Sequence, residues 1–230
     1  MIVLDNVTKR FGLRKVLSGV SFHAPRGAIT CLTGMNGVGK TTILKAIMGL
    51  TPIQGGSITI DGRTPHPAMY ERVVFVPDHL PMPGSMKVAE CLSFMNDFYR
   101  NWNPERAQSL MKMFKLNPKD RVRALSKGTA AKLNLVLGLA MDAEYMLMDE
   151  PFSGIDMFSR EQIASVFSSE LIEGRSVILT THEVREVEHL LDHVVMLDNG
   201  KVTRTFDCEE VRIREGKSVV DVMREVYTTP

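Results

Sequence analysis

One loop constrains this chain more than any other segment: residues 34–41 read GMNGVGKT. The loop follows a short apolar run and precedes residues with apolar side chains at helical spacing, so a strand and a helix are predicted to flank it. Glycines let the backbone curl so that successive N–H groups face phosphate oxygens, and the start of a helix adds positive potential. The pattern predicts a phosphate-binding loop, whose alternative is a plain glycine-rich turn. The expected contacts are Gly34, Asn36, Gly37, Gly39, Lys40, Thr41 and Thr42.

The chemistry of this loop follows from its last residues. Lys40 would reach the β- and γ-phosphates of a nucleotide, and the hydroxyl of Thr41 would bind Mg²⁺. Both expectations depend on the strand–loop–helix context, which the structure can test.

Four mostly apolar runs predict strands that are buried on both faces, as in a parallel sheet covered by helices. They span residues 28–33, 72–76, 144–148 and 176–181. Three of them lead into helix-like segments, which is the pattern of an α/β fold. One such helical pattern consists of Ile163, Val166, Phe167 and Leu171, with Gly174 just past its end.

Residues 1–30 and 53–76 indicate further β structure. Apolar residues of one parity predict a single buried face for each strand. Asp61-Gly62 marks a turn. The residues expected to share a buried face are Val16, Ser18, Val20 and Phe22, and then Ile58 and Ile60.

Residues 84–142 differ, because their apolar side chains recur at helical spacing. Asn103-Pro104 is a typical helix start, with a capping side chain followed by a first-turn proline. We interpret this segment as a helical insert within an α/β core made of residues 1–83 and 143–230, all in one domain. A short final helix is expected over residues 218–227.

Two further motifs carry polar chemistry. Asp149-Glu150 ends an apolar run, and beside a phosphate loop these carboxylates are suited to a Mg²⁺ shell and to polarising a water; the alternative is a pair of solvated acids. Ser126 and Gly128 precede a helical run and would form a second anion site, although an ordinary helix cap explains them as well.

These three motifs, in this order, resemble the ABC ATPase family, the ATP-binding subunits of ABC transporters. The resemblance extends along nearly the whole chain. It implies that Phe11 stacks on adenine, with a plain core residue as the alternative. It also implies that His182 is the switch histidine that senses the γ-phosphate, with a merely structural role as the alternative. It implies that Glu150 is the catalytic glutamate, that Ser126 and Gly128 belong to the family signature, and that residues 153–156 contact a second subunit.

The sequence departs from the family pattern at two places. Asp78 stands where the family usually has a glutamine that binds Mg²⁺, so the expected metal ligands are Thr41, Asp149 and Asp78, with a solvated loop residue as the alternative for Asp78. In the signature, Lys127 and Thr129 replace the usual glycine and glutamine. We expect a working but less typical signature.

The resemblance implies a phosphate-loop core sheet, an antiparallel β subdomain and a helical subdomain. It implies ATP and Mg²⁺ as cofactors, a head-to-tail dimer of identical or different subunits with two ATP molecules between them, and a separate transmembrane permease. Residues 96–103, NDFYRNWN, are similar to bacterial exporter-type subunits, including acetoin-utilisation-type transporters. In such subunits the insert docks on the permease; simple packing between helices is the alternative.

Composition limits the competing functions. Lys plus Arg number 28 and Asp plus Glu 27, giving a net charge of +1 that does not favour nucleic acid. The apolar runs are too short for a membrane span, the start of the chain lacks the pattern of a signal peptide, and three isolated cysteines fit a reducing cytosol. We therefore expect a cytoplasmic chain at the inner face of the membrane, reaching it only through the permease.

Two other functions compete with transport. Members of the family in DNA repair and chromosome maintenance carry long coiled coils between the two ATP motifs, and ribosome-associated members usually hold two cassettes; this chain shows neither. A degenerate subunit that binds ATP without hydrolysing it would fit Asp78 and Lys127, but Glu150 and His182 argue against it.

Overall fold

The computed structural model describes residues 1–167, 172 and 174–228. Within these residues a six-stranded sheet has the order β5-β6-β7-β3-β8-β9, and all neighbours are parallel except β8 and β9. All four predicted strands are present; every residue of β3, β6 and β7 is buried, whereas Val74 and Phe75 in β5 are half-buried. Their bounds are β3 Ile29–Gly34, β5 Val73–Val76, β6 Tyr145–Asp149 and β7 Ser176–Thr180.

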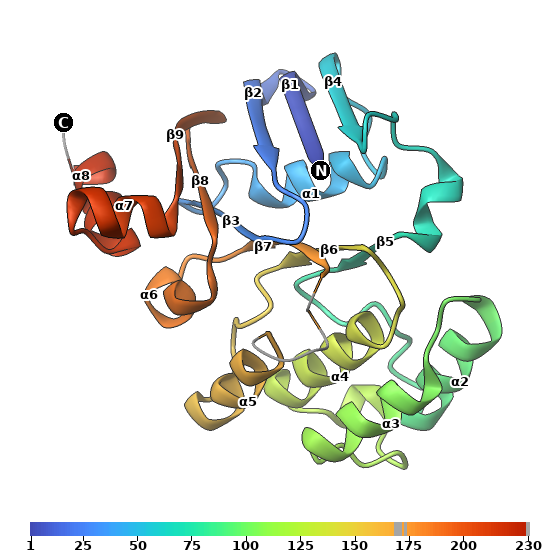
Figure 1. The fold of residues 1–230 in the computed structure, drawn as a ribbon. Coiled ribbons are helices and arrows are strands. Elements are labelled where there is room, and N and C mark those ends of the chain that lie inside the picture. Colours follow the sequence, from blue (N-terminus) through green and yellow to red (C-terminus); the bar gives the residue numbers. More distant parts are fainter. Residues whose placement is uncertain (168–171, 173, 229–230) are drawn as a thin grey trace.

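The two faces of this sheet support two separate hydrophobic clusters. Leu32 and Leu147 pack with α1 (Lys40–Ile47) and a small antiparallel sheet, whereas Cys31 and Met148 pack with the other helices. Figure 1 shows the small sheet and α1 on one side of the large sheet and α2 to α5 on the other. The uninterrupted apolar runs in the sequence are explained by this burial on both faces.

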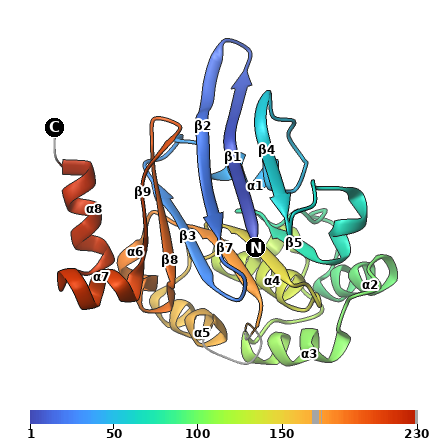
Figure 2. The ribbon, with the colours of Figure 1, turned by 45° about the horizontal axis from the view of Figure 1, so that its top comes forward.

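The small sheet has the order β2-β1-β4, built from β1 Ile2–Phe11, β2 Arg14–Ala24 and β4 Gly55–Ile60. Figure 2 shows its strands side by side above the large sheet. Val20 and Phe22 are buried as predicted, but Leu17 is buried in place of Val16 and Ser18. The reason is a β-bulge: Val7 pairs with Val20 and Thr8 with Ser18, which leaves Gly19 as an extra residue that reverses the parity.

The prediction of β structure throughout residues 53–76 is wrong for its central part. After β4 the chain turns at Asp61-Gly62, as expected, and then forms the 3₁₀ helix η1 (Pro67–Glu71) before β5 begins. Prolines at positions 65 and 67 lack the N–H that a strand would use in pairing. His66 caps the short helix by accepting a hydrogen bond from Ala68 N.

Helices occupy residues 84–142 as predicted: α2 Val88–Phe98, α3 Pro104–Met113, the 3₁₀ helix η2 Val122–Ala124 and α4 Lys127–Leu139. The side chain of Asn103 accepts a hydrogen bond from Arg106 N at 2.9 Å, which confirms the predicted helix start. The structure does not test the exact limits of the insert as a subdomain. No helix among the described residues combines the length and apolar character needed to cross a membrane.

The remaining elements follow Glu150. They are α5 Met157–Phe167, α6 Val184–Val187, the 3₁₀ helix η3 Glu188–Leu190, β8 His193–Asp198, β9 Lys201–Asp207, α7 Cys208–Glu215 and α8 Val219–Thr228. The predicted final helix is confirmed as α8, and α5 covers the predicted helical pattern except Leu171, which lies outside the described residues. The sequence analysis missed the β8–β9 hairpin, although Asn199-Gly200 at its turn is a strong hairpin signal.

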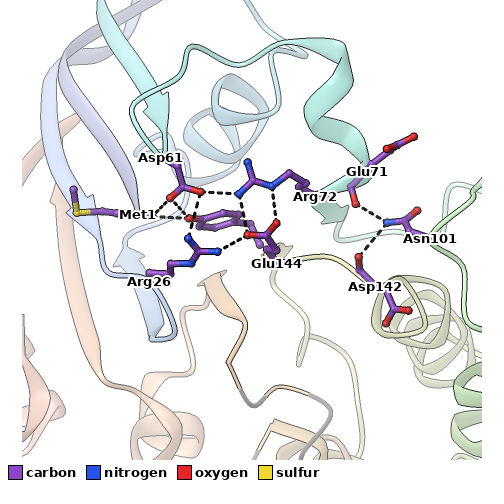
Figure 3. A network of polar contacts seen from close by, with 9 residues as sticks. Met1, Arg26, Asp61, Glu71, Arg72, Asn101, Asp142 and Glu144 are labelled. Carbon is purple, nitrogen blue, oxygen red and sulfur yellow. Dashed lines mark hydrogen bonds and ion pairs between the residues drawn. The ribbon is translucent and has the colours of Figure 1, made fainter.

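An ionic network joins the two sheets at the amino ends of β5 and β6 (Figure 3). Arg72 donates to Asp61 at 2.7 Å and to Glu144 at 2.6 Å, and Arg26 reaches the other oxygen of Glu144 at 2.6 Å. The Tyr145 hydroxyl donates to Asp61 at 2.6 Å. Hydrogen bonds from Arg72 hold the pKa of Glu144 below its usual value, so the network stays charged at neutral pH. These contacts attach the small sheet to the large sheet at the amino ends of its strands. The polar motifs lie at the opposite, carboxyl ends of those strands.

Candidate functional site

The predicted phosphate loop lies between β3 and α1, as its sequence context requires. Its lysine curls back over the loop: Lys40 Nζ donates to the carbonyl oxygen of Gly34 at 2.8 Å and lies 3.4 Å from that of Met35. The residue is only 7% exposed, so its charge is held inside the loop. The ammonium group therefore lies at a fixed position beside the loop backbone.

Two glycines of the loop are required by their surroundings. Gly34 has φ +151°, and a Cβ placed on it would lie 2.3 Å from the carbonyl oxygen of Leu197. Gly39 has φ +111°, and a Cβ there would lie 2.6 Å from Leu17 Cδ2. Both φ values disfavour L side chains, and neither position has space for one. The backbone of the loop is thus tightly held between β2 and β8.

The acidic pair lies at the end of β6, two strands from the loop. Asp149 is 2% exposed and accepts a hydrogen bond from Thr180 Oγ1 at 2.7 Å. Glu150 follows with a left-handed backbone, φ 47°, and its N–H donates to the same hydroxyl at 2.9 Å. Glu150 Oε1 lies 3.8 Å from Lys40 Nζ, which brings the acid to the phosphate loop. An unusual φ at a non-glycine residue is common where a side chain is held for function.

His182 completes the cluster from the end of β7, the strand between β6 and β3. Its Nδ1 lies 2.9 Å from Glu150 Oε2, and its backbone N–H donates to the same oxygen at 3.3 Å. The side chain is 45% exposed, so Nε2 can face a ligand. Lys40, Glu150 and His182 therefore converge at the carboxyl ends of three adjacent parallel strands, the edge where ligands of α/β proteins bind.

Other predicted residues are not in contact with this cluster. Ser126 caps α4, accepting from Thr129 N at 3.2 Å, and within the described residues no hydrogen bond or ion pair joins it to the phosphate loop. A Cβ on Gly128 would lie 3.7 Å from the carbonyl oxygen of Gly154, so the start of α4 adjoins the segment expected to contact a second subunit. The proposed nucleotide role of Ser126 and Gly128 remains a prediction.

Phe11 and Asp78 are both exposed. Phe11 is 53% exposed at the end of β1, with Lys9 Nζ 4.6 Å from its ring centroid, so it is not a core residue. Asp78 follows β5, and its carboxylate lies 2.7 Å from His79 Nδ1. This geometry is compatible with either alternative for Asp78, and the adenine contact of Phe11 also remains a prediction.

The three cysteines, which the sequence indicated were ordinary thiols, are free and buried. Burial raises the pKa of Cys91 to about 11 and that of Cys208 to about 12, and it also raises the pKa of Cys31 in β3. All three thiols are therefore protonated at neutral pH and unreactive.

The sequence analysis missed three residues that support the cluster. Thr180 hydrogen-bonds to both members of the acidic pair, and Arg160 and Glu183 form an ion pair at 3.0 Å next to His182. The signal for Thr180 was a hydroxyl residue at the end of an otherwise apolar strand. Nothing in the local sequence marked Arg160 and Glu183.

This fold and this arrangement of residues define a phosphate-loop NTPase. The family model described as ABC transporter matches residues 17–153, more than half of the chain, and the chain belongs to that family, in which it is an ATP-binding subunit and an ATPase.

Known relatives and structures agree with this assignment. The Nod factor export ATP-binding protein I of Ralstonia nicotianae is 32% identical over 96% of this chain and 72% of its own length. A solved ATP-binding subunit of an ABC transporter superposes with a TM-score of 0.88 at 24% identity, covering 99% of both chains. The ATP-binding cassette MJ0796, solved as a post-hydrolysis dimer with ADP and phosphate, gives a TM-score of 0.79 at 23% identity over 90% of this chain and 98% of that one. At these identities the two structures show the fold alone.

Proposed function

We propose that this chain hydrolyses MgATP in a head-to-tail dimer and couples hydrolysis to export by a separate transmembrane permease. The observation that carries the proposal is the convergence of Lys40, Glu150 and His182 beside a glycine loop that has no space for side chains at Gly34 and Gly39. These residues fit a nucleoside triphosphate, because cation, backbone donors and general base are all present at one sheet edge.

Each residue of the cluster has a distinct role in this proposal. Lys40 and the loop N–H groups bind the β- and γ-phosphates, and His182 contacts the γ-phosphate through Nε2. Glu150 orients the attacking water and accepts its proton. Mg²⁺, held by Thr41, Asp149 and Asp78, would neutralise phosphate charge; the nearly complete burial of Asp149 fits a carboxylate with a cation partner.

Support for the dimer comes from the exposed motifs. Ser126 at the start of α4 and Gly154 are both exposed, and a Cβ on Gly128 would lie 3.7 Å from the carbonyl oxygen of Gly154. Phe11 is exposed at the end of β1 and is available to adenine. We propose that Ser126 and Gly128 of one subunit close on ATP bound by its partner, which can be an identical or a related subunit. The dimeric cassette MJ0796 is a fold neighbour and supports this arrangement.

Support for the permease contact comes from an apolar groove between the large sheet and the helical insert. The groove has a volume of about 560 Å³. Phe98 is 70% exposed and Tyr99 40%, while Trp102 is buried, so part of the aromatic segment packs between helices and part remains available. Groove residues include Leu50, Tyr70, Phe75, Met82, Phe94 and Tyr99. We propose that the permease docks here, at the cytoplasmic face of the membrane. The similarity to a Nod factor export protein supports export.

The test is the substitution Glu150→Gln, which keeps the size of the side chain and removes its charge. Loss of a general base typically costs about 10²–10⁴-fold in rate, so turnover should nearly vanish while ATP affinity, measured by calorimetry, stays intact. With hydrolysis blocked, a dimer should accumulate in MgATP and be visible by gel filtration with light scattering. The control Glu105→Gln, at an exposed position of α3, should behave as wild type. Wild-type turnover in Glu150→Gln would refute the catalytic assignment, and an inactive but monomeric variant would refute only the unaided dimer.

A further inference from the structure

His182 has a carboxylate near each of its two ring nitrogens. Glu150 lies 2.9 Å from Nδ1, and Glu183 Oε1 lies 3.8 Å from Nε2. The first contact joins two residues of the proposed catalytic cluster. The second is too long for a hydrogen bond, but a small side-chain rotation would make it one.

Arg160 on α5 pairs with the other carboxylate oxygen of Glu183. Its Nη2 lies 3.0 Å from Glu183 Oε2, and its Nη1 pairs with Glu186. Nη2 also lies 3.3 Å from the carbonyl oxygen of Ile155, in the segment expected to contact a second subunit. The Arg160 side chain is 19% exposed, and those of Glu183 and Glu186 are 34% and 39% exposed, so both ion pairs are partly shielded from water. One side chain thus ties together the dimer-contact segment and the residue after His182.

We propose that Arg160 is a positioning residue that keeps Nε2 of His182 free for the γ-phosphate. A phosphate oxygen and a carboxylate oxygen both accept hydrogen bonds, so they compete for the position beside Nε2. With Arg160 in place, the stronger interaction for Glu183 is the guanidinium. Without it, Glu183 would turn to the imidazole and occupy the nitrogen that ATP requires.

The inference rests on the proposed function, in which His182 acts on ATP, and goes beyond it by assigning a role to a residue that acts only through Glu183 and His182. Its link to Ile155 also predicts a coupling between the two subunits. A subunit that binds against residues 153–156 would press on the backbone that Arg160 holds, and so would affect Glu183 beside His182.

The test compares kcat and KM for ATP in single and double variants. Arg160→Gln keeps a donor for Ile155 and removes the charge. Because a repositioned Glu183 would occupy Nε2 of His182, kcat should fall about tenfold or more, while KM changes little because the phosphate loop is intact. Adding Glu183→Gln removes the competing carboxylate, so the double variant should regain most of the wild-type kcat. A purely structural ion pair predicts no such rescue.

Glu186→Gln is the matched control, because it also removes one carboxylate partner of Arg160 but has no contact with His182 among the described residues. It should keep kcat close to wild type, with a similar change in melting temperature to Glu183→Gln. If Arg160→Gln does not fold, Arg160→Lys with and without Glu183→Gln provides the same comparison. The inference is overturned if the double variant is as slow as the single one, or if Glu186→Gln is as slow as Arg160→Gln. Failure of the proposed function is distinguishable, since Glu150→Gln would then remain active.

Discussion

The sharpest structural prediction concerns Thr180, whose hydroxyl links the two acidic residues of the site. Its Oγ1 donates to Asp149 Oδ1 at 2.7 Å and accepts from Glu150 N at 2.9 Å. The residue is fully buried at the end of β7. Thr180→Val replaces this hydroxyl by a methyl group of nearly the same size, so it removes the two hydrogen bonds while changing the packing little.

The loss of stability in Thr180→Val depends on which groups lose a hydrogen-bond partner. Asp149 is 2% exposed, so water cannot replace the lost donor, and a hydrogen bond to a charged group contributes about 1.5–3 kcal/mol. The N–H of Glu150 keeps a second acceptor, the carbonyl oxygen of Thr180 at 3.2 Å, and therefore adds little. We expect a loss of roughly 2–3 kcal/mol in the free energy of unfolding, which at an m value of about 2–3 kcal/mol/M lowers the urea midpoint by roughly 1 M.

Thr30→Val is the matched control in the neighbouring strand β3. Its hydroxyl is also fully buried, yet it has no hydrogen-bond partner within the part of the chain that the structure describes. Removing an unsatisfied buried hydroxyl should leave stability unchanged or raise it. Urea unfolding followed by circular dichroism measures both variants. Equal midpoints for Thr180→Val and Thr30→Val would refute the view that the Thr180 hydroxyl stabilises the acidic pair.

Two further predictions address pH and metal dependence. Burial, and then the charge of His23, whose ring centroid lies 5.7 Å from that of His193, lower the pKa of His193, so the unfolded chain binds this proton more readily. The free energy of unfolding should be at its full value above the ordinary histidine pKa of about 6.5 and should decrease as the pH falls below it. His193→Asn should flatten this decrease in urea midpoints measured from pH 7.5 to 5.5, and an unchanged slope would contradict the assignment. Asp78→Ala should raise the Mg²⁺ concentration for half-maximal hydrolysis and Asp78→Gln should not, whereas identical titrations would make Asp78 a solvated loop residue.

The parts of the fold that the sequence predicted are those decided by local chemistry. The phosphate loop needs glycine at Gly34 because of its own backbone, and a strand buried on both faces must be apolar throughout. The predictions that were wrong concern features that depend on residues far apart in the sequence. The parity of β2 changes because Gly19 is an extra residue relative to β1, and only the pairing of the two strands reveals it.

The same contrast between local and non-local determinants applies to the site. Lys40, Glu150 and His182 were predictable because each follows a recognisable strand. Thr180 was not, because its role depends on the register of two strands: Asp149 and Thr180 are direct partners in the β6–β7 pair. Arg160 depends on how α5 packs against the loop after β7, which no short sequence pattern encodes.

The order of the strands explains why Asp78, which stands where the family usually has a glutamine, needs a kinetic test. In the order β5-β6-β7-β3, Asp78 follows a strand three positions away from the phosphate loop, whereas Asp149 ends a strand two positions away. At about 4.8 Å between neighbouring strands, Asp78 starts roughly 14 Å from the loop. Its carboxylate is exposed and paired with His79, and its side chain is shorter than the glutamine it replaces. Asp78 can therefore reach a metal at the phosphate loop only if its own loop moves inward. If Asp78→Ala raises the Mg²⁺ requirement, that movement is part of the hydrolysis cycle, and the loop after β5 would connect the metal to the apolar groove at which we propose that the permease docks.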